Sequence, residues 1–246
     1  MSMVLREELS EGIVAITLNR PESLNALSPA LFSELNQIVT ELSKQTDSVG
    51  CVILRGAGRC FSAGNDLKAV RSGVKAKEKF FQAKTIDLVE KLPQPTIASV
   101  HGHCLTGALE LAIACDLMIT SESANLADTH GKWGMVPGWG MSVRLPRRVG
   151  LLKAKEMMFT GMSINGLQAV EIGLSSQCVA DDHLKVSTLD LAESIVKNSW
   201  HTNFADKKLF LDNENHFHDA SLKMEREQSA SVASDMHERV KQGFKS

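Results

Sequence analysis

Apolar and polar positions alternate in short blocks along this chain, and the spacing of the apolar positions differs from block to block. Residues 13–18 (Ile-Val-Ala-Ile-Thr-Leu) alternate well enough to predict a strand. Ser28 and Pro29 then provide an N-cap and a first-turn proline, which predict the start of a helix. The apolar stripe of this helix, at helical spacing, consists of Leu31, Leu35, Ile38 and Leu42.

The same reading predicts further strands and helices in alternation. Strands are expected at residues 49–54, 96–100 and 117–120, with a turn at 56–58 after the first of them. One helix should reach about Lys91, where Pro93 and Pro95 end it, and another should begin near Gly107. The last predicted helices cover residues 184–198 and, in pieces, about 204–244. No linker divides the alternating part, so these patterns predict an α/β fold followed by a helical C-terminal region.

Composition narrows the class of protein without identifying a function. The 246 residues are 43% hydrophobic and 23% charged, with a formal net charge of −2 and no basic tract that would favour nucleic acid. No apolar run approaches the roughly 18 residues of a membrane span, and residues 1–8 lack an apolar signal core. Five scattered cysteines without a Cys-x-x-Cys pair predict reduced thiols in a cytoplasmic protein. His101, His103 and Cys104 lack a distant further ligand, so we expect no metal site.

Two segments carry the strongest chemical signal, residues 61–66 and residues 101–116. The second segment passes through Gly107 into an apolar helix, whose first N–H groups have no partner within the helix and lie at its positive end. Gly107 has no Cβ that would keep a ligand away from this backbone. Glu110 follows three residues later, on the same side of the first turn. Backbone donors beside a carboxylate suit chemistry at the α and β carbons of a thioester.

These segments resemble the crotonase, or enoyl-CoA hydratase/isomerase, superfamily, and the resemblance runs from about residue 12 to residue 181. The matching strings, in family order and spacing, are residues 19–27, 61–68, 105–116, 134–140 and 144–146, with Gly150. The resemblance implies a crotonase-like spiral of repeated strand–strand–helix units in residues 1–182, which holds the acyl-CoA site. It also implies that the C-terminal helical region, residues 183–246, forms a homotrimer or a dimer of trimers.

The resemblance also assigns roles to particular residues. The backbone N–H groups of Asn65 and Gly107 would form the oxyanion hole, and Glu110 would be the general base. No prosthetic group is implied, because coenzyme A enters as part of the thioester substrate. The positions that resemble those lining the path of the coenzyme are Ala26, Ala63, Asp66, Leu67 and Lys68.

One position departs from the family pattern in a way that bears on the reaction. Hydratases of the family carry a second glutamate where this chain has His130. The imidazolium of His130 could donate the proton that the glutamic acid would supply, or the neutral ring could orient water. Alternatively, His130 is structural and the acid role is lost or passes to Asp128, which could instead hold the ring. Trp133 and Trp139 either shape the acyl pocket or belong to the core.

The leading hypothesis is a lyase that adds water to a 2-enoyl-CoA. Simple double-bond isomerisation is disfavoured, because isomerases of the family generally keep the second acid and lose the first. Hydrolysis, decarboxylation and carbon–carbon cleavage of another acyl-CoA remain alternatives that Glu110 and His130 could serve. A third hypothesis is a protein that binds acyl-CoA without catalysis, but the presence of Glu110 argues against it. The pathway is fatty-acid oxidation or the degradation of another carboxylic acid.

Overall fold

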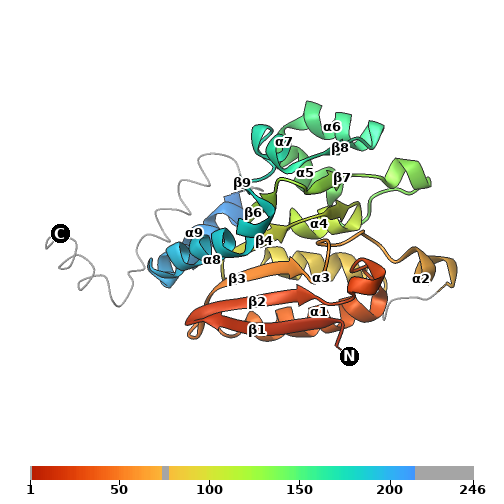
Figure 1. The fold of residues 1–246 in the computed structure, drawn as a ribbon. Helices are drawn as coiled ribbons and strands as arrows, with labels where there is room; N and C mark the ends of the chain where they lie inside the picture. Colours follow the sequence, from red (N-terminus) through yellow and green to blue (C-terminus); the bar gives the residue numbers. More distant parts are fainter. Residues whose placement is uncertain (1, 74–77, 214–246) are drawn as a thin grey trace, which may run out of the picture.

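A twisted sheet of six strands organises the fold (Figure 1). The structure, a computed structural model, describes residues 2–73 and 78–213. The strands lie in the order β1-β2-β3-β4-β6-β9, and only the β1–β2 pair is antiparallel. Their bounds are β1 (Val4–Ser10), β2 (Gly12–Leu18), β3 (Val49–Gly56), β4 (Thr96–Val100), β6 (Leu117–Ser121) and β9 (Gln177–Val179).

A second sheet of three short strands lies beside the first and consists of β5 (His103–Leu105), β7 (Asn125–Ala127) and β8 (Ser163–Ile164). In chain order, the sequence strand, strand, helix recurs as β1-β2-α1, β4-β5-α4 and β6-β7-α5, which confirms the expected repetition. The α-helices of the described residues are α1 (Pro29–Leu42), α2 (Leu67–Arg71), α3 (Phe81–Glu90), α4 (Gly107–Ala112), α5 (Met141–Val149), α6 (Leu151–Thr160), α7 (Gly166–Glu171), α8 (Leu184–Val196) and α9 (Trp200–Asn213).

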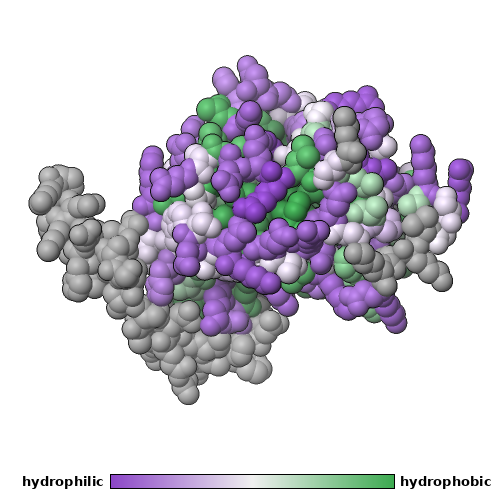
Figure 2. Space-filling view, turned by 90° about the horizontal axis from the view of Figure 1, so that it is seen from below, coloured by the Kyte–Doolittle hydropathy of each residue, from purple (hydrophilic) through white to green (hydrophobic). Residues whose placement is uncertain are grey.

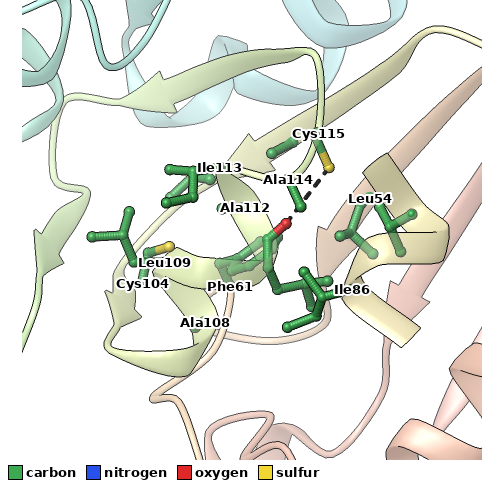
Figure 3. Close-up of a cluster of buried hydrophobic side chains, with 14 of the residues drawn as sticks. Leu54, Phe61, Ile86, Cys104, Ala108, Leu109, Ala112, Ile113, Ala114 and Cys115 are labelled. Atoms are coloured by element: carbon green, nitrogen blue, oxygen red, sulfur yellow. Dashed lines mark hydrogen bonds between the residues drawn. The ribbon is translucent and has the colours of Figure 1, made fainter. Parts of the chain in front are cut away.

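The central strands β2, β3, β4 and β6 are buried on both faces, as parallel strands usually are, whereas the edge strand β1 is mostly exposed. Along β2, Val14 and Ile16 enter the larger apolar core, whereas Ile13 and Ala15 enter a smaller one on the opposite face. Part of the larger core, including Phe61 and the side chains of α4, is drawn in Figure 3. The central helix α4 is therefore surrounded by packed side chains, which fixes the position of its first turn.

Helix α8 covers the smaller core. Leu184 and Ala192 of α8 pack with Ile53 and Ile97 of the sheet. The C-terminal helical region, predicted to begin at residue 183, thus starts with a helix that shares a core with the strands. The predicted helical pieces beyond Asn213 lie outside the described residues.

Most of the elements predicted from the apolar pattern are confirmed. The Ser28 side chain accepts a hydrogen bond from the N–H of Leu31 at 3.2 Å, as the N-cap prediction requires. The predicted strands and the helices over residues 29–42 and up to about 91 are present, and β3 extends to Gly56, at the start of the predicted turn. Helix α2 and strand β5 were not expected, because each is too short to show a periodic pattern.

One face of the molecule shows how polar and apolar residues are distributed on the surface (Figure 2). On the face drawn in Figure 2, hydrophilic residues surround smaller hydrophobic areas. Among the described residues, no helix combines the length and apolarity needed to cross a membrane.

Candidate active site

The two glycine-containing segments meet at a cavity of about 560 Å³. Asn65 from the first segment and Gly107 and Glu110 from the second all line this cavity, as does His130. The structure thus brings together the four residues predicted to be catalytic. The rest of the lining is largely apolar and comprises Ala63, Leu67, Leu105, Thr106, Thr129, Lys132, Trp133, Met135, Val136, Gly138 and Trp139.

Backbone contacts set the position of Asn65. The N–H of Leu27 donates to the carbonyl of Gly64 at 2.8 Å, and the N–H of Asp66 donates to the carbonyl of Leu27 at 3.3 Å. In this parallel pairing, the N–H of the intervening residue lies on the opposite side of the chain. The N–H of Asn65 therefore faces away from Leu27. A Cβ at Gly64 would overlap the carbonyl oxygen of Leu105, so only glycine allows the two segments to approach this closely.

The start of helix α4 is held in a strained conformation. Thr106, the residue before Gly107, has φ 55° and ψ −112°, which is rare for a residue with a Cβ. Its N–H donates to the carbonyl of Ala127 at 2.8 Å, and its hydroxyl bonds to the hydroxyl of Thr129. These contacts orient the peptide that carries the N–H of Gly107. As the first residue of α4, Gly107 has no acceptor for this N–H within the helix.

Gly107 is required for a reason that differs from the expected one. A Cβ at this position would collide with the ring of Trp139. Trp139 also packs edge-on against Phe32, with ring centroids 5.1 Å apart, and so cannot move aside freely. The prediction that Gly107 is a glycine so that a ligand can approach is therefore incomplete, because a core aromatic ring occupies part of that space. Trp139 serves both interpretations offered for it, core packing and pocket lining.

Glu110 is a buried carboxylate with fixed partners. Its side chain is 1% exposed, and its Oε1 accepts hydrogen bonds from the N–H groups of Trp139 at 2.9 Å and Met141 at 3.0 Å. Burial raises the pKa of Glu110 above its usual value, and the nearby Asp128 adds to the rise. The two N–H groups and the neighbouring His130 oppose this shift. Oε2 remains available to face the cavity.

His130 lies beside Glu110 and is held by Asp128. Oδ1 of Asp128 is 2.5 Å from Nδ1 of His130 and also accepts the backbone N–H of His130 at 3.1 Å. An ionised carboxylate only accepts hydrogen bonds, so Nδ1 carries the proton in this contact. Nε2 of the ring lies 3.7 Å from Oε2 of Glu110. Of the roles considered for Asp128, the geometry matches that of holding the ring.

The residues predicted to line the coenzyme path divide into two groups. Ala63 and Leu67 line the cavity, but Ala26, Asp66 and Lys68 are not among its lining residues. Asp66 instead caps helix α2 and forms a 2.9 Å ion pair with Arg20, whose guanidinium also donates to the carbonyl of Ala26. In this structure Asp66 and Ala26 thus help to hold the loop. A contact between any of the five and a ligand stays a prediction.

Several lining residues were not singled out from the sequence. Thr106 and Thr129 brace the start of α4, but neither stands out in a sequence because threonine is common in loops. Lys132, Met135 and Val136 belong to the segment after His130, whose path follows from no periodic pattern. Trp133 is 58% exposed, so the interpretation of this residue as part of the core is wrong.

Backbone N–H groups beside a buried carboxylate, on a repeated strand–strand–helix scaffold, are an arrangement that could stabilise an oxyanion. The model of the family described as enoyl-CoA hydratase/isomerase matches residues 8–246, and the chain belongs to this family. The protein shares the crotonase fold: it matches an enoyl-CoA hydratase structure from Bacillus anthracis with a TM-score of 0.92 and 34% identity, over 99% of this chain and 96% of that one.

Curated relatives agree with this assignment. The chain is 35% identical over 189 residues to "Probable enoyl-CoA hydratase 1, peroxisomal" of Arabidopsis thaliana, and this match covers 77% of this chain and 71% of that protein. It is 34% identical over 194 residues to the short-chain-enoyl-CoA hydratase of Clostridium acetobutylicum, and this match covers 77% of this chain and 74% of that protein.

Gly64→Ala tests the close approach of the two segments. The added Cβ would meet the backbone of Leu105 and would be held at φ +92°, so we expect a loss of stability of at least about 2 kcal/mol. Gly73→Ala is the matched control, because Gly73 also has a positive φ but no atom of the described residues lies within 4 Å of the added Cβ. It should cost only about 1 kcal/mol. Chemical denaturation measures both, and equal losses would contradict the proposed approach.

Proposed function

We propose that the protein is an enoyl-CoA hydratase, which adds water across the double bond of a 2-enoyl-CoA. The observation that carries this proposal is the position of two polar side-chain atoms, Oε2 of Glu110 and Nε2 of His130, side by side at 3.7 Å in a cavity that is also lined by Asn65 and Gly107. Coenzyme A is part of the substrate in this proposal, and no prosthetic group takes part.

The pair is suited to hold one water molecule. A water at an ordinary hydrogen-bond distance of about 2.8 Å from both atoms fits as the apex of a triangle whose base is 3.7 Å. The proposal uses the form of His130 in which Nδ1 donates to Asp128 and Nε2 carries no proton, so that Nε2 is an acceptor. The water then donates one hydrogen to Glu110 and the other to His130. Its lone pairs are left free to attack the β carbon.

The proposed reaction follows from these contacts. The water oxygen bonds to the β carbon while Glu110 takes a proton, and the electrons of the double bond move onto the thioester oxygen. The N–H groups of Asn65 and Gly107 stabilise that oxyanion, and such fixed donors typically contribute about 3–4 kcal/mol each. The α carbon then receives a proton held by the Glu110–His130 pair, which completes the addition of water and restores the enzyme.

The lining of the cavity supports an apolar acyl group. Leu105, Met135, Val136 and the two tryptophans contribute apolar surface around Glu110 and His130. The largely apolar lining around the buried side chains of Glu110 and His130 limits the access of bulk water to the thioester, which strengthens the electrostatic stabilisation of the oxyanion.

Glu110→Gln and His130→Ala test the proposal. We expect the native protein to remove the conjugated enoyl-thioester absorbance across a series of 2-enoyl-CoA chain lengths without releasing free thiol. Each variant should lose about a hundredfold or more of this activity, since a positioned general base contributes that much. The comparison measures initial rates and thiol release in the same samples.

His103→Ala is the matched control, because it removes an exposed imidazole from β5. It should keep native activity. Release of free thiol would instead identify a thioester hydrolase. Absence of any turnover, with retained acyl-CoA binding in the native protein and in Glu110→Gln, would identify a binder.

We also propose that the chain forms a homotrimer or a dimer of trimers. The support is a set of large apolar side chains exposed on α6: Leu151, Leu152 and Phe159 are 60%, 84% and 80% exposed. Exposed apolar groups of this kind mark surfaces of association.

Light scattering after size exclusion should give three or six times the 26.8 kDa mass of the chain. Combining Leu152→Ser with Phe159→Ser should lower the measured mass, because the apolar contribution of α6 to association is removed. A native protein that runs at the mass of a single chain at micromolar concentration would contradict the proposal.

A further inference from the structure

The two N–H groups that hold Glu110 belong to a short turn, and the turn itself is held from behind by Arg144. Nη1 of Arg144 donates to the carbonyl of Trp139 at 2.8 Å. The N–H of the same residue, Trp139, donates to Oε1 of Glu110. The guanidinium and the carboxylate are therefore linked through one residue of the backbone.

Arg144 is in turn anchored on helix α3. Its Nε and Nη2 bond to the two carboxylate oxygens of Glu90 at 2.7 and 2.6 Å, and Nη2 also bonds to Asp87 at 2.6 Å. The arginine side chain is 9% exposed. A bidentate pair of this kind fixes the plane of the guanidinium and so the direction of its remaining N–H groups.

The turn leaves room for this arrangement only because residue 140 is a glycine. Gly140 has φ +113°, and a Cβ there would collide with Nη1 of Arg144. The N–H groups on both sides of Gly140, those of Trp139 and Met141, converge on the same oxygen of Glu110. The glycine thus lets the backbone wrap between the guanidinium and the carboxylate.

We infer that Arg144 is a positioning residue for Glu110: anchored by Glu90 and Asp87, it orients the 139–141 turn whose N–H groups hold the carboxylate of the general base. This inference rests on the proposed function for the role of Glu110 as a base. Arg144 is not among the residues that line the cavity, so it acts through the backbone of Trp139, which does line it.

The charges around Glu110 and Arg144 determine the direction in which loss of Arg144 should move the pKa of Glu110. Glu110 faces His130 and Asp128 on one side and the N–H groups of the turn on the other, and Arg144 faces Asp87, Glu90 and the neighbouring Arg148. The turn N–H groups favour the ionised carboxylate. Displacing them should raise the pKa of Glu110, so that the base is ionised only at higher pH.

Arg144→Lys and Arg144→Met test the inference. The lysine keeps the charge but cannot reproduce the bidentate contact together with the bond to Trp139. The pKa of Glu110 can be followed by ¹³C NMR of labelled glutamate carboxyl groups, with the signal assigned by its absence in Glu110→Gln. We expect the titration to move to higher pH in both variants. The acid limb of the pH–rate profile should move the same way, with turnover at neutral pH reduced about a hundredfold.

Arg147→Met is the matched control, because it removes an exposed positive charge from the same helix and should leave the titration unchanged. Glu90→Gln keeps Arg144 but weakens its anchor, and should give a smaller shift in the same direction if the Arg144 variants fail to fold. A titration of Arg144→Lys that coincides with the native one would overturn the inference. A shifted titration in a protein without enoyl-CoA turnover would support the positioning role and overturn the hydratase proposal instead.

Discussion

The buried carboxylate of Glu110 is the constraint on which much of the structure around the cavity depends. A carboxylate with almost no exposure is costly unless its oxygens accept hydrogen bonds. Here the N–H groups of Trp139 and Met141 donate these hydrogen bonds, and both residues lie in the turn at residues 139–141 that leads into α5. The turn requires Gly140 in a left-handed conformation, and α5 carries the arginine that braces it. The position of one side chain on α4 therefore sets the conformation of a segment about 30 residues further on.

The candidate oxyanion donors depend on a second constraint, the close approach of two backbone segments. Phe61, buried in the larger core, anchors one segment, and strand β5 carries the other toward Thr106. Between them, Gly64 has space for a hydrogen atom but not for a Cβ. Strain at Thr106 is offset by hydrogen bonds from both its backbone and its hydroxyl. Rigid neighbours on all sides are what a fixed pair of donors requires, because donors that had to reorganise would stabilise a developing charge less.

The apolar pattern and a few motifs predict a large part of this arrangement. Strand β2 and helix α1 follow from local spacing and capping, which depend only on near neighbours in the chain. The resemblance of the glycine segments to a known family predicts Asn65, Gly107 and Glu110 as site residues. The sequence does not predict the contacts that position these residues, because the contacts join residues distant in the chain. Arg144 bonds to Glu90 of α3, and the ring of Trp139 fills the space beside Gly107. No periodicity encodes such pairings, and a glycine in a sequence does not reveal which atom occupies the place of its missing Cβ.

The exchange of a second glutamate for His130 has a physical consequence in the proposed mechanism. Two carboxylates that face one water repel each other, so one of them must keep a proton. An imidazole facing Glu110 avoids that repulsion and still accepts a hydrogen bond, provided that its other nitrogen holds the proton. Asp128 meets that condition through its contact with Nδ1 of His130. The second negative charge is thereby moved to the far side of the ring, away from the water. In the proposed mechanism Asp128 is therefore needed together with His130, because without Asp128 the imidazole ring would have no fixed tautomer.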